Sequence, residues 1–182
     1  MINRLPIVGV MGSGKDSWKE LSSPLGEALG RRKVHLLTGG GQGVMTEVAA
    51  AFCSVPERIG ISIGILPTEK IDGKFNLREG YPNQYIELPI ITPLGVFDGI
   101  DGVNRNFVNI LTADIVIALP GSQGTKNEVE LAIKFKRPLV LFGPSEKTSE
   151  LIEQRISDEK QVICQFDSLD RLLEWLDTQL TR

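Results

Sequence analysis

The chain has 182 residues, 24% of them charged, and a formal net charge of −3, which is the size and composition of one soluble globular unit. Acidic and basic residues are mixed without a basic stripe, so nucleic acid is not an expected partner. The apolar run near the N-terminus is too short for a signal peptide or a membrane span. We therefore expect residues 1–182 to form a single cytoplasmic domain that has no membrane partner.

Short apolar runs rich in Val, Ile and Leu predict strands that are buried on both faces of a parallel sheet. Helical patterns lie between most of these runs, and the last is the clearest, with leucines at helical spacing after Ser168, the expected N-cap residue. This alternation predicts an α/β fold, a mostly parallel sheet with helices on both faces. The expected strands are Leu5–Met11, Val34–Leu37, Ile61–Leu66, Ile115–Leu119, Leu139–Phe142 and Val162–Phe166.

The first strand runs into VGVMGSGKDSW, which is one residue short of the phosphate-binding loop of nucleotide triphosphatases. Asp16 stands where that loop needs a Ser or Thr to hold magnesium, so an ATPase is disfavoured. Gly12, Ser13 and Gly14 still suit a tight strand-to-helix turn that lines a pocket.

The start of the next helix bears on the same question. Ser23 and Pro24 have the pattern of an N-cap followed by Pro at the first helical position, which would start the helix about eight residues after Lys15. Ser17 and Glu20 form an alternative capping box further upstream.

The segment from Thr68 to Gly102 interrupts the alternation of strands and helices. It holds several Gly and Pro residues and at most one strand, Gln84–Ile91. We expect a long loop beside the ligand site, because long loops in compact domains are often functional.

Two later strands also end in glycine turns, in the sequences TGGGQGVM (residues 38–45) and PGSQGTKNE (residues 120–128). The carboxyl ends of parallel strands lie at one edge of the sheet, and glycine lets a ligand approach the backbone closely. Three such turns favour a site for a phosphate-bearing small molecule or nucleotide. The candidate binding residues are Gly12, Ser13, Gly40, Gly41, Gly43, Met45, Asn106, Pro120, Gly121, Ser122, Gly124 and Thr125.

Two charged side chains are candidates for chemistry at this edge. In a helix that begins near Gly124–Thr125, Glu128 falls between Phe135 and Ala132, on the side that faces the sheet. The carboxylate could cap the helix or act as a catalyst, and the helical geometry leaves both open. Arg105 lies on a different expected helix, and the pattern of that helix predicts its environment.

A helix is expected over Val103–Ala113, with an apolar stripe that includes Leu111. Arg105, Asn109 and Thr112 lie on the opposite face. Taken alone, this placement predicts that Arg105 is a solvated side chain.

The residues GGGQGVM, GILP (64–67), RN (105–106) and ADIVIALPGSQGTKNE together resemble the LOG family, which is often labelled lysine decarboxylase-like. This family includes cytokinin riboside 5'-monophosphate phosphoribohydrolases and the related molybdenum cofactor carrier proteins. The resemblance runs from about Pro6 to Pro144. It implies a Rossmann-like, doubly wound fold and a homodimer or higher homo-oligomer, and we expect no resident cofactor and no metal.

The family motif P-G-G-x-G-T-x-x-E, preceded by an Arg, implies roles for individual residues. By position, Arg105 and Glu128 match the catalytic pair. The phosphate-binding turn is matched by Gly121, Gly124 and Thr125. The phosphate would then lie on the free N–H groups at the start of the helix.

Three departures from the motif separate two hypotheses. Ser122 replaces the second motif Gly, Asn106 replaces the Lys usual in phosphoribohydrolases, and Asn127 replaces a frequent acidic residue. One hypothesis is a hydrolase that cleaves the N-glycosidic bond of a nucleoside 5'-monophosphate, with Glu128 at the ribose and Arg105 stabilising charge. The alternative is a non-catalytic carrier of the molybdenum cofactor, a pterin phosphate, or another nucleotide-binding protein.

Overall fold

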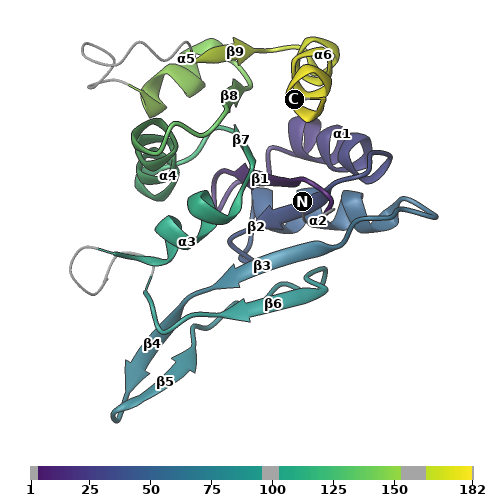
Figure 1. Ribbon diagram of the computed structural model, residues 1–182. Coiled ribbons are helices and arrows are strands. Elements are labelled where there is room, and N and C mark those ends of the chain that lie inside the picture. The colour runs from purple at the N-terminus through teal and green to yellow at the C-terminus, as the bar shows by residue number, and fades with distance from the viewer. Residues whose placement is uncertain (1–3, 96–102, 153–162, 182) are drawn as a thin grey trace.

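A computed structural model describes residues 4–95, 103–152 and 163–181 of the chain. Its elements alternate between strands and helices, apart from four consecutive strands in the middle and two short consecutive helices near residue 149 (Figure 1). In chain order they are β1 (Ile7–Met11), α1 (Lys19–Gly30), β2 (His35–Thr38), α2 (Val44–Ser54), β3 (Ser62–Leu66), β4 (Thr68–Ile71), β5 (Lys74–Leu77), β6 (Leu88–Ile91), α3 (Arg105–Thr112), β7 (Ile115–Ala118), α4 (Gln123–Lys134), β8 (Leu139–Phe142), α5 (Ser145–Thr148), η1 (Ser149–Leu151), β9 (Cys164–Phe166) and α6 (Leu169–Leu180).

Seven strands form one parallel sheet in the order β6-β3-β2-β1-β7-β8-β9. The chain builds outward from β1 to one edge and then returns to β7 on the other side of β1, so the sheet is doubly wound. The direction of winding reverses between β1 and β7, where Gly9 is in register with Val116. The predicted Rossmann-like α/β fold is confirmed, and this reversal is the usual place for a ligand crevice.

Helices cover both faces of the sheet, with α1, α2 and α6 on one face and α3 and α4 on the other (Figure 1). Successive strand residues alternate between the two cores: Leu36 packs with α1 and α2, and Leu37 packs with α3 and α4. Burial on both faces explains why the strands appear in the sequence as continuous apolar runs, and each fully buried Leu contributes about 1.5–3 kcal/mol.

The first helix begins earlier than expected. Helix α1 starts at Lys19, only four residues after Lys15, and Pro24 lies inside it, so the predicted N-cap at Ser23 is wrong. The alternative capping box is also absent, because the N-cap residue is Trp18 and no side chain caps it. The buried stripe of α1 already includes Ser22, upstream of Pro24, so packing against the sheet outweighs the one hydrogen bond that proline removes.

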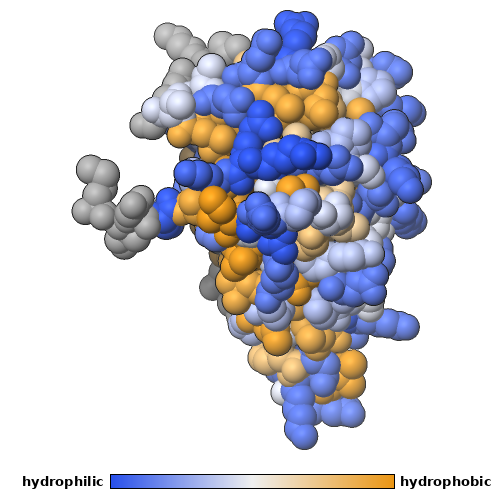
Figure 2. Space-filling view, turned by 90° about the vertical axis from the view of Figure 1, so that its right-hand side faces the viewer, coloured by the Kyte–Doolittle hydropathy of each residue, from blue (hydrophilic) through white to orange (hydrophobic). Residues whose placement is uncertain are grey.

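The segment that follows Leu66 is not the long loop expected from its Gly and Pro content. Strands β4 and β5 pair as an antiparallel hairpin, and β6 forms the edge strand of the main sheet, shorter than the expected Gln84–Ile91. Figure 2 shows hydrophobic surface toward the tapered end that this region forms. Its exposed large apolar side chains are Ile71, Phe75, Leu77, Leu88, Ile90 and Ile91. Residues 96–102, which the expected loop included, lie outside the described residues.

Near the C-terminus the structure follows the sequence closely. Ser168 is the N-cap residue of α6, as predicted, although its side chain makes no capping hydrogen bond. Cys53 and Cys164 are free and half-buried. None of the helices over the described residues is long and apolar enough to cross a membrane.

Candidate functional site

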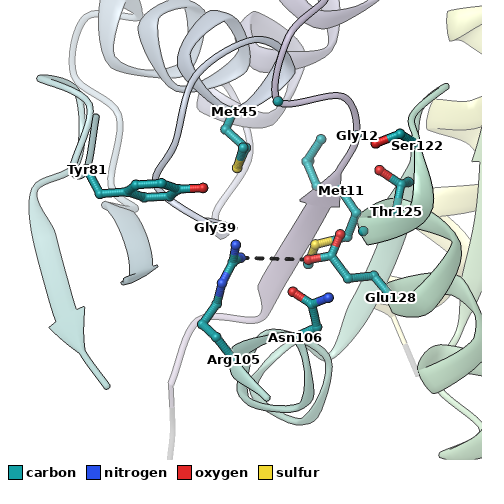
Figure 3. A pocket seen from close by; sticks show the side chains of 13 residues that line it. Met11, Gly12, Gly39, Met45, Tyr81, Arg105, Asn106, Ser122, Thr125 and Glu128 are labelled. Carbon is teal, nitrogen blue, oxygen red and sulfur yellow. Dashed lines mark ion pairs between the residues drawn. The ribbon is translucent and has the colours of Figure 1, made fainter. Parts of the chain in front are cut away.

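Three turns meet where β1, β2 and β7 end. The N–H of Ser13 donates to the carbonyl of Pro120 at 3.1 Å, and the N–H of Val44 donates to the carbonyl of Ser13 at 2.9 Å. The turn after β1 is therefore bonded to the turns after β7 and β2. This convergence surrounds a cavity of about 130 Å³ (Figure 3). The cavity is lined by Val10, Met11, Gly12, Gly14, Gly39, Met45, Tyr81, Arg105, Asn106, Ser122, Gly124, Thr125 and Glu128.

The cavity brings together nine of the residues singled out in the sequence, from all three turns and from α3 and α4. These are Gly12, Gly14, Met45, Arg105, Asn106, Ser122, Gly124, Thr125 and Glu128. The other six candidates are absent from the lining, although they belong to the same turns: Ser13, Gly40, Gly41, Gly43, Pro120 and Gly121. These six shape the turns, whereas the nine lining residues face the cavity.

Arg105 is 4% exposed, so the prediction of a solvated side chain is wrong. Helix α3 turns its polar face into the site and leaves Leu111 of its apolar stripe 45% exposed. Asn104 caps the helix by accepting a hydrogen bond from the N–H of Asn106 at 3.0 Å. Gly39 makes room for the guanidinium, because a Cβ there would overlap Arg105 Nη1.

Glu128 points inward from α4, as its position on the helix predicted, and is 7% exposed. Its Oε1 accepts a hydrogen bond of 2.8 Å from Asn109 Nδ2 and lies 3.8 Å from Arg105 Nη1 (Figure 3). Burial raises the pKa of the Glu128 carboxyl, while the Arg105 charge and the Asn109 hydrogen bond act in the opposite direction. The carboxyl group is therefore already engaged by two neighbours.

Polar groups in the site still lack partners. Arg105 Nε and Asn109 Oδ1 are buried and make no hydrogen bond within the described residues. Unpaired buried polar atoms cost about 1–3 kcal/mol each, so Arg105 and Asn109 are held next to the cavity at a cost in stability, which is common at functional sites.

The first turn of α4 supplies a second set of unpaired donors. The helix begins at Gln123, with Ser122 as an N-cap residue whose side chain makes no capping bond. In the described parts of the chain, the N–H groups of Gly124 and Thr125 have no acceptor. Free N–H groups and the positive end of the helix dipole together bind anions.

Asn106 and Asn127 pair across the start of α3 and α4. Asn106 Nδ2 donates to Asn127 Oδ1 at 3.0 Å, and Asn104 Nδ2 lies 3.4 Å from the same oxygen. Asn106 and Asn127 are two of the three positions at which the sequence departs from the hydrolase motif. Neutral amide groups therefore join the start of α3 to α4 beside the cavity.

Four cavity residues escaped the sequence analysis: Val10, Met11, Gly39 and Tyr81. Gly39 lies in the same glycine run as Gly40 and Gly41, so the pattern that predicted those residues also included Gly39. Tyr81 comes from the segment after the hairpin and had no sequence signal. Within residues 4–95, 103–152 and 163–181, no group of three or more His, Cys, Asp or Glu side chains could hold a metal ion.

Comparisons with solved structures agree with this architecture. The molybdenum cofactor binding protein from the phototrophic bacterium Rippkaea orientalis is 28% identical, with a TM-score of 0.73 over 96% of this chain and 97% of that chain. The Moco carrier protein from Chlamydomonas reinhardtii is 26% identical in one structure, with a TM-score of 0.71 over 98% of this chain and 99% of that chain.

Sequence comparisons cover most of the chain as well. An uncharacterized protein from Archaeoglobus fulgidus is 26% identical over 149 residues, which are 77% of this chain and 86% of that relative. The model of the SLOG cluster4 family matches residues 5–172, which include every element of the cavity. The chain therefore belongs to the SLOG cluster4 family.

Proposed function

We propose that this chain binds a small phosphate-bearing heterocycle of the pterin-phosphate class, such as the molybdenum cofactor, and releases it unchanged. The observation that carries the proposal is the pairing of two unsatisfied donor sets on one cavity. One set is the guanidinium of Arg105, which makes no hydrogen bond in the described chain and lies 3.8 Å from Glu128 through Nη1, and the other is the free N–H groups of Gly124 and Thr125. Both sets suit an anion, and neither has an acceptor in the described chain.

The cavity also offers an apolar portion that suits the ring of such a ligand. Met11, Met45 and Tyr81 line it together with the polar groups. Ligand pockets combine an apolar lining with a few placed polar groups in this way. The similarity to proteins described as binding or carrying the molybdenum cofactor, at 26–28% identity over nearly the whole chain, supports the pterin-phosphate class.

The hydrogen bond and the burial of the Glu128 carboxyl support binding without catalysis. A catalyst of glycoside cleavage needs a carboxylate that is free to stabilise positive charge on the ribose. Here Asn109 holds the carboxyl at 2.8 Å, and burial raises its pKa. The neutral pair of Asn106 and Asn127 replaces the charged side chains usual in the hydrolase motif.

One observation favours a second candidate, a LOG-type phosphoribohydrolase. Arg105 and Glu128 lie side by side on the cavity wall, as the motif requires of its catalytic pair. In that reaction water adds to the ribose carbon and the N-glycosidic bond breaks, giving ribose 5-phosphate and the free base. Glu128 would hold the ribose hydroxyls or orient the water, and Arg105 would stabilise the departing base or the phosphate.

Two measurements on the purified protein separate these functions. Fluorescence anisotropy with hydroxymethylpterin monophosphate reports binding, and chromatography after incubation with AMP reports free adenine. We expect saturable binding, lost in Arg105→Met, and no adenine release above the rate without protein. Glu130→Gln is the matched control, because Glu130 lies on the exposed face of the same helix as Glu128. Adenine release that disappears in Glu128→Ala would instead establish the hydrolase.

We also propose that the chain is a cytoplasmic homodimer or higher homo-oligomer, as the resemblance to the LOG family implies. Light scattering during size-exclusion chromatography tests the assembly, and a mass equal to one chain of 20.0 kDa would refute it.

A further inference from the structure

Among the described residues, Tyr81 is the one aromatic side chain that lines the cavity, and it comes from a segment that the sequence motif does not include. It lies on the side of the cavity opposite Glu128, with its hydroxyl directed toward the space beside Arg105 (Figure 3). The hydroxyl has no hydrogen-bond partner in the described parts of the chain. The residue is half-buried, so its ring is neither part of the core nor loose in solvent.

The loop that carries Tyr81 is fastened to the glycine turn after β2. Asn83 donates from its backbone N–H to the carbonyl of Gly40 and from its side chain to the carbonyl of Gly41, both at 2.8 Å. Gln42 donates to the carbonyl of Gly80 at 3.1 Å. Asn83 is 5% exposed, so its two bonds are shielded from water. Tyr81 is thus held between two anchored positions of the loop.

The glycine turn is also shaped to accept the ring. A Cβ at Gly41 would come within 2.9 Å of Tyr81 Cε1 and Cζ, closer than carbon atoms pack. Glycine at this position therefore lets the Cε1–Cζ edge of the ring lie against the turn. This explains why Gly41 matters to the site without lining the cavity.

We propose that Tyr81 is a specificity-determining residue, which recognises the heterocyclic ring of the ligand by contact with its own ring and by a hydrogen bond from its hydroxyl. The inference rests on the proposed function, because it assigns the two ends of that ligand. The phosphate lies at the start of α4, and the ring lies at the opposite end, between Tyr81 and Met45. Arg105 lies between the two ends.

Affinities for two probes, hydroxymethylpterin monophosphate and inorganic phosphate, test the assignment in wild type, Tyr81→Phe and Tyr81→Ala. We expect the pterin phosphate to bind about three- to tenfold more weakly to Tyr81→Phe, which loses one hydrogen bond. We expect a loss of about tenfold or more in Tyr81→Ala, which also loses the ring contact. Inorganic phosphate, measured by calorimetry, should bind all three proteins within about twofold, because it does not reach Tyr81.

Tyr85→Phe is the matched control, since Tyr85 lies on the same loop and packs against the core instead of lining the cavity. It should bind both probes as wild type does. Unchanged pterin-phosphate affinity in Tyr81→Ala would overturn the role of Tyr81 and leave the proposed function intact. An equal loss of both probes would also overturn it, because Tyr81 would then act through the fold of the loop. Failure of wild type to bind either probe would overturn both proposals.

Discussion

The side chains of Asn106 and Asn127 are joined by a hydrogen bond of 3.0 Å that links the first turn of α3 to the second turn of α4. Asn106 is 1% exposed and Asn127 is half-buried, so this bond is partly shielded from water. The hydrolase motif usually has a Lys at the first position and often an acidic residue just before its Glu. In this chain a neutral amide–amide hydrogen bond joins these two positions, whereas the hydrolase motif has side chains there that could form an ion pair.

This contact predicts strong coupling between the two positions. Asn106→Lys alone should lower the free energy of unfolding by about 2 kcal/mol, because it buries an ammonium group without a counter-charge. Asn127→Asp alone should cost about 1 kcal/mol, and the double variant should recover most of the loss, with a coupling energy of at least about 1 kcal/mol. Urea denaturation of all four proteins measures this cycle. Additive effects would show that the two side chains do not interact in solution.

The pKa of Glu128 predicts how stability varies with pH. Burial raises this pKa above its ordinary value of 4.5, so the folded protein holds a proton that the unfolded chain releases. Between 4.5 and the folded pKa, the free energy of unfolding falls as pH rises, by at most about 1.4 kcal/mol per pH unit. Glu128→Gln lacks this titration. The variant should therefore match wild type at low pH and become relatively more stable as the pH rises.

Denaturation of both proteins over a series of pH values tests this prediction. All other acids are common to the two proteins, so their contributions cancel in the difference. A difference that stays constant with pH, or that grows toward acid, would mean that Glu128 is not held in a site that favours its protonated form.

The strands and the edge that carries the site could be predicted because burial on both faces leaves a plain signal. Runs such as Leu139–Phe142 are apolar throughout and correspond residue for residue to the observed strand. The inward direction of Glu128 followed from helix geometry alone, because α4 is long enough for its apolar positions to define the buried side.

The incorrect predictions have a common cause. Where local sequence patterns conflict, tertiary contacts determine which structure forms. Arg105 lies opposite an apolar stripe, yet it is buried because Gly39 and Glu128 provide a place for its charge. The Ser23-Pro24 pattern predicted the start of a helix, but Pro24 lies inside α1. Tyr81 reaches the cavity only because Asn83 binds a turn about forty residues earlier, and no local pattern records such a contact.

Gly26 gives a prediction about the core that is independent of the ligand site. A Cβ there would overlap the carbonyl oxygen of Val48 and lie 2.8 Å from Ala51 Cβ, so the glycine lets α1 pack directly on α2. Gly26→Ala should lower the free energy of unfolding by about 1–2 kcal/mol, since overpacking exceeds the gain in helix propensity. Gly124→Ala is the control, because a Cβ there meets nothing within 4 Å, and it should not destabilise the protein. Equal stability of wild type and Gly26→Ala in urea would refute the close helix contact.

Gly39 tests whether the placement of Arg105 controls binding. A Cβ at Gly39 would overlap Arg105 Nη1 and lie 2.9 Å from its Cζ, and both atoms are at the movable end of a side chain. Gly39→Ala should therefore displace the guanidinium and weaken binding of hydroxymethylpterin monophosphate by about tenfold, while changing the free energy of unfolding by less than about 1 kcal/mol.

Two further variants make this last test specific. Gly14→Ala is the control for adding a methyl group to the cavity wall, because its Cβ would meet only Met45 Cε, at 3.7 Å, and it should bind within about twofold of wild type. The double variant Gly39→Ala/Arg105→Met should bind no more weakly than Arg105→Met alone, since both changes remove the same contact. If the two losses add, Gly39 contributes to the site by another route and the guanidinium is not what the glycine makes room for.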